Sequence, residues 1–169
     1  MTKIEKLSEI ATFQPQAAYA AFTHSLTIRW NFLMQTVPDI KELLHPFEAA
    51  IRYQFLPAIT EKQALNDMER DLISLPARSG GLGIMNPTNT ASQQFGVFKK
   101  VTELLVSVIH QQSYSYPDQI QADQRQATRA VCNCNHTAAT KEAEAIKQKL
   151  SSSQQVAMDQ TSERGHPLG

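Results

Sequence analysis

The residues best suited to chemistry lie in two short stretches, and the first is a cysteine–histidine cluster. CNCNH, residues 132–136, brings Cys132, Cys134 and His136 within five positions. If this segment is helical, each residue turns by about 100°, so Cys132 and His136 share a face while Cys134 points nearly opposite. A structural zinc site also needs a fourth ligand, usually from a second pair. We therefore expect no metal site and no cofactor.

The second stretch is LPARSGGLGI, residues 75–84, which is the only dense glycine segment. A phosphate-binding P-loop needs Lys and then Ser or Thr after its last glycine, and a dinucleotide fingerprint needs GxGxxG between a strand and a helix. Gly80, Gly81 and Gly83 fit neither pattern. We predict that they supply positive φ angles in a tight turn between helices. No small-molecule ligand is indicated.

Carboxylates and nucleophiles are scattered along the chain. Asp67, Glu69 and Asp71 alternate around a predicted short helix, so at most Asp67 and Asp71 share a face. Acidic residues at a helix N-terminus are favoured by the helix dipole, which is the simpler explanation of this group. No serine lies in a GxSxG elbow. These patterns predict that the chain is not an enzyme.

Basic residues offer a candidate nucleic-acid surface. Arg29 stands beside Trp30 in an early helix, Arg78 precedes the glycines, and Lys99 and Lys100 are adjacent in a later helix. Lysine and arginine side chains bind phosphate backbones, but the same residues equally suit a solvated helix face. The chain has 16 basic and 16 acidic residues and zero formal net charge, so any such role needs a local patch.

Helix signals dominate and strand signals are almost absent, which predicts an all-α helical bundle. Pro15 suits the first turn of a helix, because its missing N–H is unpaired there in any case. The following segment predicts one helix to about residue 37, with Trp30 and Phe32 widening its apolar surface. Its main buried stripe follows spacings of four and seven and comprises Ala18, Phe22, Leu26, Leu33 and Val37.

Prolines and polar caps bound the next helices. Asp39 is a plausible cap, and Pro46 either begins a helix or kinks one. Pro57 prevents easy continuation of the helix before it. Asn66 or Asp67 could cap a further short helix ahead of the glycine segment.

The longest regular helix is predicted to be capped by Thr88 or Thr90. Gly96 inside it weakens the helix by about 1 kcal/mol relative to alanine, unless a neighbour packs closely there. Apolar residues at spacings of three and four predict a packing seam of Phe95, Phe98, Thr102, Leu105 and Ile109, with Val101 and Val108 alongside.

The domain organisation follows from composition. We predict a lead-in over residues 1–14, a compact helical domain over 15–113, and a polar helical arm with a flexible tail over 114–169, where the sequence becomes glutamine-rich. A short strand or extended piece is expected around 81–85. No apolar run approaches the ~20 residues of a membrane helix, and the charged start lacks the apolar core of a secretory signal. These features and only two cysteines predict an intracellular protein in the cytoplasm or nucleus.

Several short motifs occur along the chain in an order that is more specific than any one of them alone. They are AAYAAFTHS, the Arg29–Trp30 pair, QTVP, Pro46-Phe47-Glu48 and LPARSGGLGIMNP, followed by KKVTELLVSVIHQQ and a helical tail. Together they resemble reverse-transcriptase open reading frames of animal retrotransposons, in the part just C-terminal to the polymerase palm. The resemblance covers nearly the whole chain. It implies the thumb and connector of an RNA-directed DNA polymerase, which in that family pack against the primer–template duplex.

The resemblance also limits what the chain can do. Polymerases of this family hold two metal ions with carboxylates that include an Asp-Asp pair, and no Asp-Asp occurs in this sequence. Gln35 and Ser79 depart from the residues usual in the family, which suggests a diverged copy. We expect a noncatalytic fragment with at most weak binding to an RNA–DNA or RNA backbone through a parent polymerase. The alternative is a helical protein–protein interaction or self-association module, which zero net charge and the apolar first helix favour.

Overall fold

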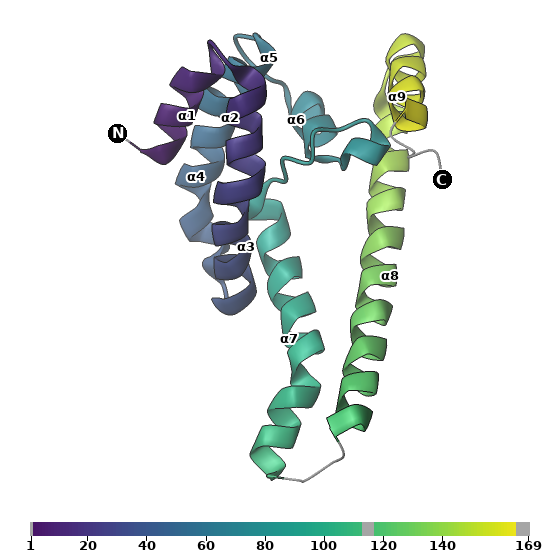
Figure 1. Cartoon of the computed structure of the whole chain (residues 1–169). Helices are drawn as coiled ribbons and strands as arrows, with labels where there is room; N and C mark the ends of the chain where they lie inside the picture. The colour runs from purple at the N-terminus through teal and green to yellow at the C-terminus, as the bar shows by residue number, and fades with distance from the viewer. Residues whose placement is uncertain (1, 113–116, 165–169) are drawn as a thin grey trace.

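The computed structural model describes residues 2–112 and 117–164, and its regular elements there are all helical, which confirms the all-α prediction (Figure 1). No strand occurs in the described part of the chain, and residues 82–86 have no regular secondary structure, so the short strand or extended piece expected around 81–85 is a loop and not a strand. The α-helices are α1 (Lys3–Ala11), α2 (Pro15–Ala21), α3 (Thr27–Thr36), α4 (His45–Ala50), α5 (Leu56–Thr60), α6 (Asp67–Ser74), α7 (Pro87–Gln111), α8 (Pro117–Lys149) and α9 (Ser152–Arg164). Short π-helices are η1 (Phe22–Leu26) and η3 (Ile51–Phe55), and 3-10 helices are η2 (Ile40–Leu44) and η4 (Ala77–Ser79).

The N-terminal residues belong to the compact part of the molecule. Thr2 and Glu5 form a capping box that begins α1. This helix packs on α2, η3 and α5, and it contributes Ile4 and Ala11 to the main core. The compact part therefore begins upstream of Pro15, within the residues that the sequence suggested as a lead-in.

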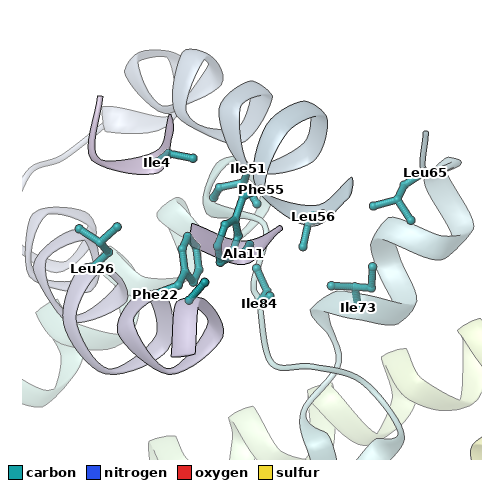
Figure 2. Close-up of a cluster of buried hydrophobic side chains, with 11 residues drawn as sticks. Ile4, Ala11, Phe22, Leu26, Ile51, Phe55, Leu56, Leu65, Ile73 and Ile84 are labelled. Carbon is teal, nitrogen blue, oxygen red and sulfur yellow. The ribbon is translucent and has the colours of Figure 1, made fainter. Parts of the chain in front are cut away.

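The main core is built around two π-turns (Figure 2). In η1 the N–H of Thr27 reaches the Phe22 carbonyl, and in η3 the N–H of Leu56 reaches the Ile51 carbonyl, five residues back in each case. Phe22 stacks on Phe55 from the second π-turn, with ring centroids 4.4 Å apart and planes 20° apart. This stack joins the two helical segments at the centre of the bundle.

The π-turn in η1 changes which residues of the first long helix face inward. Beyond Leu26, the helix buries Met34 and turns Trp30 against Phe22 and Phe47. Leu33 and Val37, predicted to continue the buried stripe, are exposed. Residues four apart on a regular α-helix are not exactly in line, so a stripe with this spacing gradually rotates around the helix. A π-turn holds an extra residue, which compensates for this rotation and keeps every fourth side chain on the inner face.

The second π-turn explains how the chain passes Pro57. The sequence suggested that Pro57 would stop its helix, yet α5 follows η3 without a break. Proline lacks an N–H and crowds the preceding turn of a regular α-helix. Pro57 lies at the start of α5, just after the wider π-turn, where the hydrogen-bond pattern is already interrupted.

Helix α7 leaves the bundle as a long arm. Asn86 caps it by accepting hydrogen bonds from the Thr88 and Asn89 N–H groups, so the cap lies two residues before the predicted Thr88. Its first turns pack on α3 and η2, where Ala91 joins a small cluster with Met34, Ile40 and Leu44. Farther along, Phe98 and Ile109 of the predicted seam are exposed.

Helix α8 returns antiparallel to α7, and α9 folds back beside its end (Figure 1). Ala143 and Ile146 of α8 are buried against Leu75, with Leu72 and Met158 partly buried around them. Ile146 lies on the arm that the sequence predicted to be polar and helical, and the end of α6 covers it. The predicted boundary at 113/114 lies outside the described residues.

Candidate functional site

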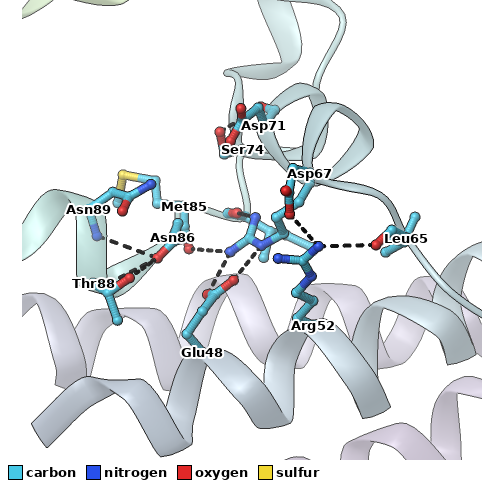
Figure 3. Close-up of polar contacts among 12 residues, drawn as sticks. Glu48, Arg52, Leu65, Asp67, Asp71, Ser74, Met85, Asn86, Thr88 and Asn89 are labelled. Atoms are coloured by element: carbon cyan, nitrogen blue, oxygen red, sulfur yellow. Dashed lines mark hydrogen bonds and ion pairs between the residues drawn. The ribbon is translucent and has the colours of Figure 1, made fainter. Parts of the chain in front are cut away.

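A buried ion pair organises the centre of the molecule (Figure 3). The Arg70 guanidinium donates to both Glu48 oxygens, at 2.7 Å from Nε and 2.8 Å from Nη2. It also donates to the Ile84 carbonyl at 2.8 Å and the Met85 carbonyl at 3.2 Å. Arg70 thus ties α4 and α6 to the loop before α7. No sequence pattern indicated this pair beyond the presence of Glu48 in the Pro46-Phe47-Glu48 motif.

The glycine segment wraps back over the end of α6. The Leu82 and Ile84 N–H groups donate to the Ile73 carbonyl at 3.1 and 3.3 Å, and the Gly83 N–H donates to the Leu75 carbonyl at 2.8 Å. The Tyr19 hydroxyl holds the loop from α2 by donating to the Leu82 carbonyl at 2.6 Å. The loop therefore satisfies carbonyls that a helix end leaves without partners.

The three loop glycines serve two different purposes. Gly80 and Gly83 have φ angles of 81° and 67°, as a tight turn requires. Gly81 is needed for space instead, because a Cβ there would lie 2.0 Å from the Leu75 carbonyl oxygen. The predicted turn between helices is present, and positive φ accounts for only part of it.

The predicted nucleic-acid residues do not form one patch. Arg29 is exposed on α3, whereas its neighbour Trp30 turns inward against Phe22 and Phe47, so the pair does not share a surface. Arg78 lies in η4, which packs against α9 on the far side of the molecule from α3 (Figure 1). Lys99 and Lys100 are exposed on the middle of α7.

Two arginines that the sequence reading missed lie opposite these lysines. Arg125 and Arg129 are exposed and one turn apart on α8. The Gln93 side chain donates to the Asn135 side-chain oxygen at 3.4 Å, and this contact defines the register between the antiparallel helices α7 and α8. Counted from that contact at about 1.5 Å per residue, Lys99 and Lys100 lie near the level of Arg129. The available signal was arginine at an i,i+4 spacing in a glutamine-rich stretch.

Helix α3 presents an apolar outer face. Ile28 and Phe32, one helical turn apart, are 63% and 64% exposed, and the adjacent Leu33 is 41% exposed. Arg29 lies among them. We call Ile28, Phe32 and Leu33 the α3 outer face.

The acidic residues of α6 separate into different roles. Asp67 pairs with Arg52 at 2.5 Å, and this hydrogen bond raises the pKa of the Arg52 guanidinium. Glu69 accepts from Lys62 and from the Asn66 N–H, and these two hydrogen bonds lower the pKa of its carboxyl. Asn66 is the cap, and Glu69 completes its capping box. Asp71 is exposed and faces a cleft instead.

Within the described residues, no group of three or more His, Cys, Asp and Glu side chains could hold a metal ion. Cys132, Cys134 and His136 are all exposed on α8, where Thr140 contacts the His136 ring at 3.3 Å. Helix geometry directs the two cysteines to nearly opposite sides. Nor does any helix of the described part combine the length and apolarity that a membrane crossing needs.

A cleft of about 410 Å³ lies under the glycine loop. Its walls are the end of α6, the first turns of α7 and the second half of α8, and residues of the loop between α6 and α7 also line it. Amide side chains line much of it, including Asn89, Gln93 and Asn135. The sequence had indicated no small-molecule site, because its lining residues come from three helices that are far apart along the chain.

Comparison with known proteins adds no relative. A scan against protein-family models found no match, and searches of curated proteins and of solved structures found none either. The resemblance to reverse transcriptases therefore stays a prediction that rests on the motifs of the sequence.

Proposed function

We propose that the chain is a noncatalytic helical module, akin to the thumb and connector of a reverse transcriptase, that self-associates by docking on a second copy of the chain. The observation that carries this proposal is the α3 outer face. Ile28 and Phe32 are each almost two-thirds exposed on a helix whose opposite side buries Met34. The helix therefore has apolar residues on both sides, and the core uses only one of them.

The energetics favour covering this face. Isolated apolar residues are common on protein surfaces, but Ile28, Phe32 and Leu33 are neighbours on one helix. Removing apolar surface from water contributes about 25 cal/mol per Å². Aromatic side chains such as Phe32 are enriched in interface cores, where charged residues are depleted. Arg29 can extend its aliphatic stem along the face while its charge stays in water.

Light scattering across a concentration series tests this proposal. In the isolated chain the α3 outer face has only a second copy to dock on. We therefore expect a discrete dimer, whose fraction increases with protein concentration. Ile28→Gln with Phe32→Gln should shift the chain to monomer. The matched control is Ile109→Gln, because Ile109 is 74% exposed but lies on α7, and this variant should dimerise normally. A monomer at every concentration, or equal loss in the control, would reject the proposal.

A second candidate function is weak binding to a template–primer backbone. Lys99 and Lys100 on α7, with Arg125 and Arg129 on α8, support it, since two helices bring positive charge to a similar level. Such contacts bind phosphate without reading bases. Zero net charge keeps the expected affinity low.

Fluorescence anisotropy with an RNA–DNA hybrid at low salt tests this second function. Replacing Lys99, Lys100, Arg125 and Arg129 with glutamine should abolish binding. Lys99→Gln alone should lower the slope of log binding constant against log salt concentration by about one, because one phosphate contact is lost. Arg29→Gln is the control, since Arg29 is exposed on α3 and does not lie on α7 or α8, which carry the four basic residues. Binding that all of these variants leave unchanged would exclude this surface.

Both proposals include an intracellular location. The free, exposed Cys132 and Cys134 suit a reducing compartment.

A further inference from the structure

The cleft beneath the glycine loop has the size of a small-molecule site. Its 410 Å³ falls within the range of about 300–1,000 Å³ that is usual for ligand pockets. Hydrogen bonds from the Arg70 and Tyr19 side chains hold the loop that lines the cleft. The Gln93–Asn135 hydrogen bond spans from α7 to α8 on the opposite side. The cleft is therefore built on supported elements.

The charged groups that line the cleft are both acidic. Asp71 comes from α6 and Glu142 from α8, so the two carboxylates lie on different walls. Neither forms an ion pair with another described residue, and no lysine or arginine is among the described lining residues. The C-terminal end of α6, which carries partial negative charge, also borders the cleft. The electrostatic character of the cleft favours a cation.

The surface between the two carboxylates is partly apolar. Leu75 and Met85 contribute from the loop side, and Ala138 and Ala139 contribute from α8. Side-chain amides supply further hydrogen-bond acceptors, and among the described residues the Asn89 side chain has no hydrogen-bond partner. Asn86 also lines the cleft, but its side-chain oxygen is already used in capping α7.

We propose that this cleft binds a linear aliphatic polyamine. Ammonium groups at two positions of such a chain can pair with Asp71 of the α6 wall and Glu142 of the α8 wall, while the methylene groups lie over Leu75 and Met85. Ammonium–carboxylate hydrogen bonds are charge-assisted and stronger than neutral ones. A monoamine satisfies only one of the two carboxylates, so the cleft should prefer a polyamine.

Isothermal titration of the full chain with spermidine tests the proposal, with propylamine and MgCl₂ as comparison ligands. Asp71→Asn and Glu142→Gln should each weaken spermidine binding about tenfold. Both residues are exposed, so neither change disturbs the core. Glu103→Gln is the matched control, because Glu103 is exposed on α7 outside the cleft. This variant should bind spermidine with the same affinity as the wild type.

The position of the ligand can be read separately by NMR. Spermidine should shift the side-chain amide signals of Asn89 and Gln93, while that of Gln126 on the exposed part of α8 stays in place. Spermidine that binds no more tightly than MgCl₂, or that loses affinity equally in Glu103→Gln, would overturn the proposal. So would binding that both cleft variants leave unchanged, since it would then reflect general attraction to acidic residues.

Discussion

Arg70 and Glu48 form a two-point ion pair in the interior, with nitrogen–oxygen distances of 2.7 and 2.8 Å. The Arg70 side chain is only 2% exposed, and every one of its three nitrogens has a recorded partner. The pair is the point at which α4, α6 and the loop before α7 meet. Its loss is therefore expected to affect the whole fold.

Glu48→Ala should lower the free energy of unfolding by about 3–5 kcal/mol, because it leaves the Arg70 charge buried without a carboxylate. Urea denaturation measures the change. Glu42→Ala is the control, since Glu42 pairs with His45 at the surface, and it should cost less than about 1 kcal/mol. Equal effects of the two substitutions would show that the buried pair has no special structural importance.

Gly81→Ala should be much more destabilising than Gly83→Ala. A Cβ at Gly81 would lie 2.0 Å from the Leu75 carbonyl oxygen and 2.6 Å from that of Leu72, so backbone must move, at a cost of at least about 2 kcal/mol. Gly83 has open space around it and a φ of 67°, so alanine there costs only about 1 kcal/mol for the left-handed conformation. Thermal and urea unfolding of both variants measure the difference. The reverse order would contradict the close approach at Gly81.

Gly96→Ala should stabilise the chain. Gly96 lies inside α7, and apart from its chain neighbours and the adjacent backbone of the helix, no atom of the described residues lies within 4 Å of the position that its Cβ would occupy. Alanine therefore gains helix propensity without a clash, which is worth about 1 kcal/mol. An increase in the urea midpoint at unchanged slope is the expected result. A decrease would mean that another surface packs against this position.

Glu69 should make stability depend on pH in the acid range. Its hydrogen bonds from Lys62 and the Asn66 N–H lower the pKa of its carboxyl below the ordinary 4.5. A lowered folded-state pKa contributes stability that is fully present above about pH 4.5 and is lost as the pH falls through the folded value. The stability difference between wild type and Glu69→Gln should therefore shrink as the pH falls below about 4.5.

Urea unfolding at each pH measures that difference. Glu9→Gln, an exposed change on α1, is the control and should follow the wild type across the same range. A difference between wild type and Glu69→Gln that stays constant with pH would contradict the assigned hydrogen bonds of Glu69.

Local signals in the sequence determined the class of the fold and many of its boundaries. Pro15 begins α2, Asn66 caps α6, and the glycine segment forms a turn between helices, as predicted. These features depend on nearby residues, since caps and turns are made by groups a few positions apart. Composition predicted a polar helical arm within residues 114–169, and α8 lies in this range.

The tertiary structure decided everything that depends on distant residues. The π-turns place Trp30 and Met34 inside and leave Leu33 and Val37 outside, because Phe22 packs on Phe55 from a segment far along the chain. The Arg70–Glu48 pair and the cleft under the loop likewise join separate helices. A sequence pattern records the period of one helix, and only packing between helices determines which of its faces is covered.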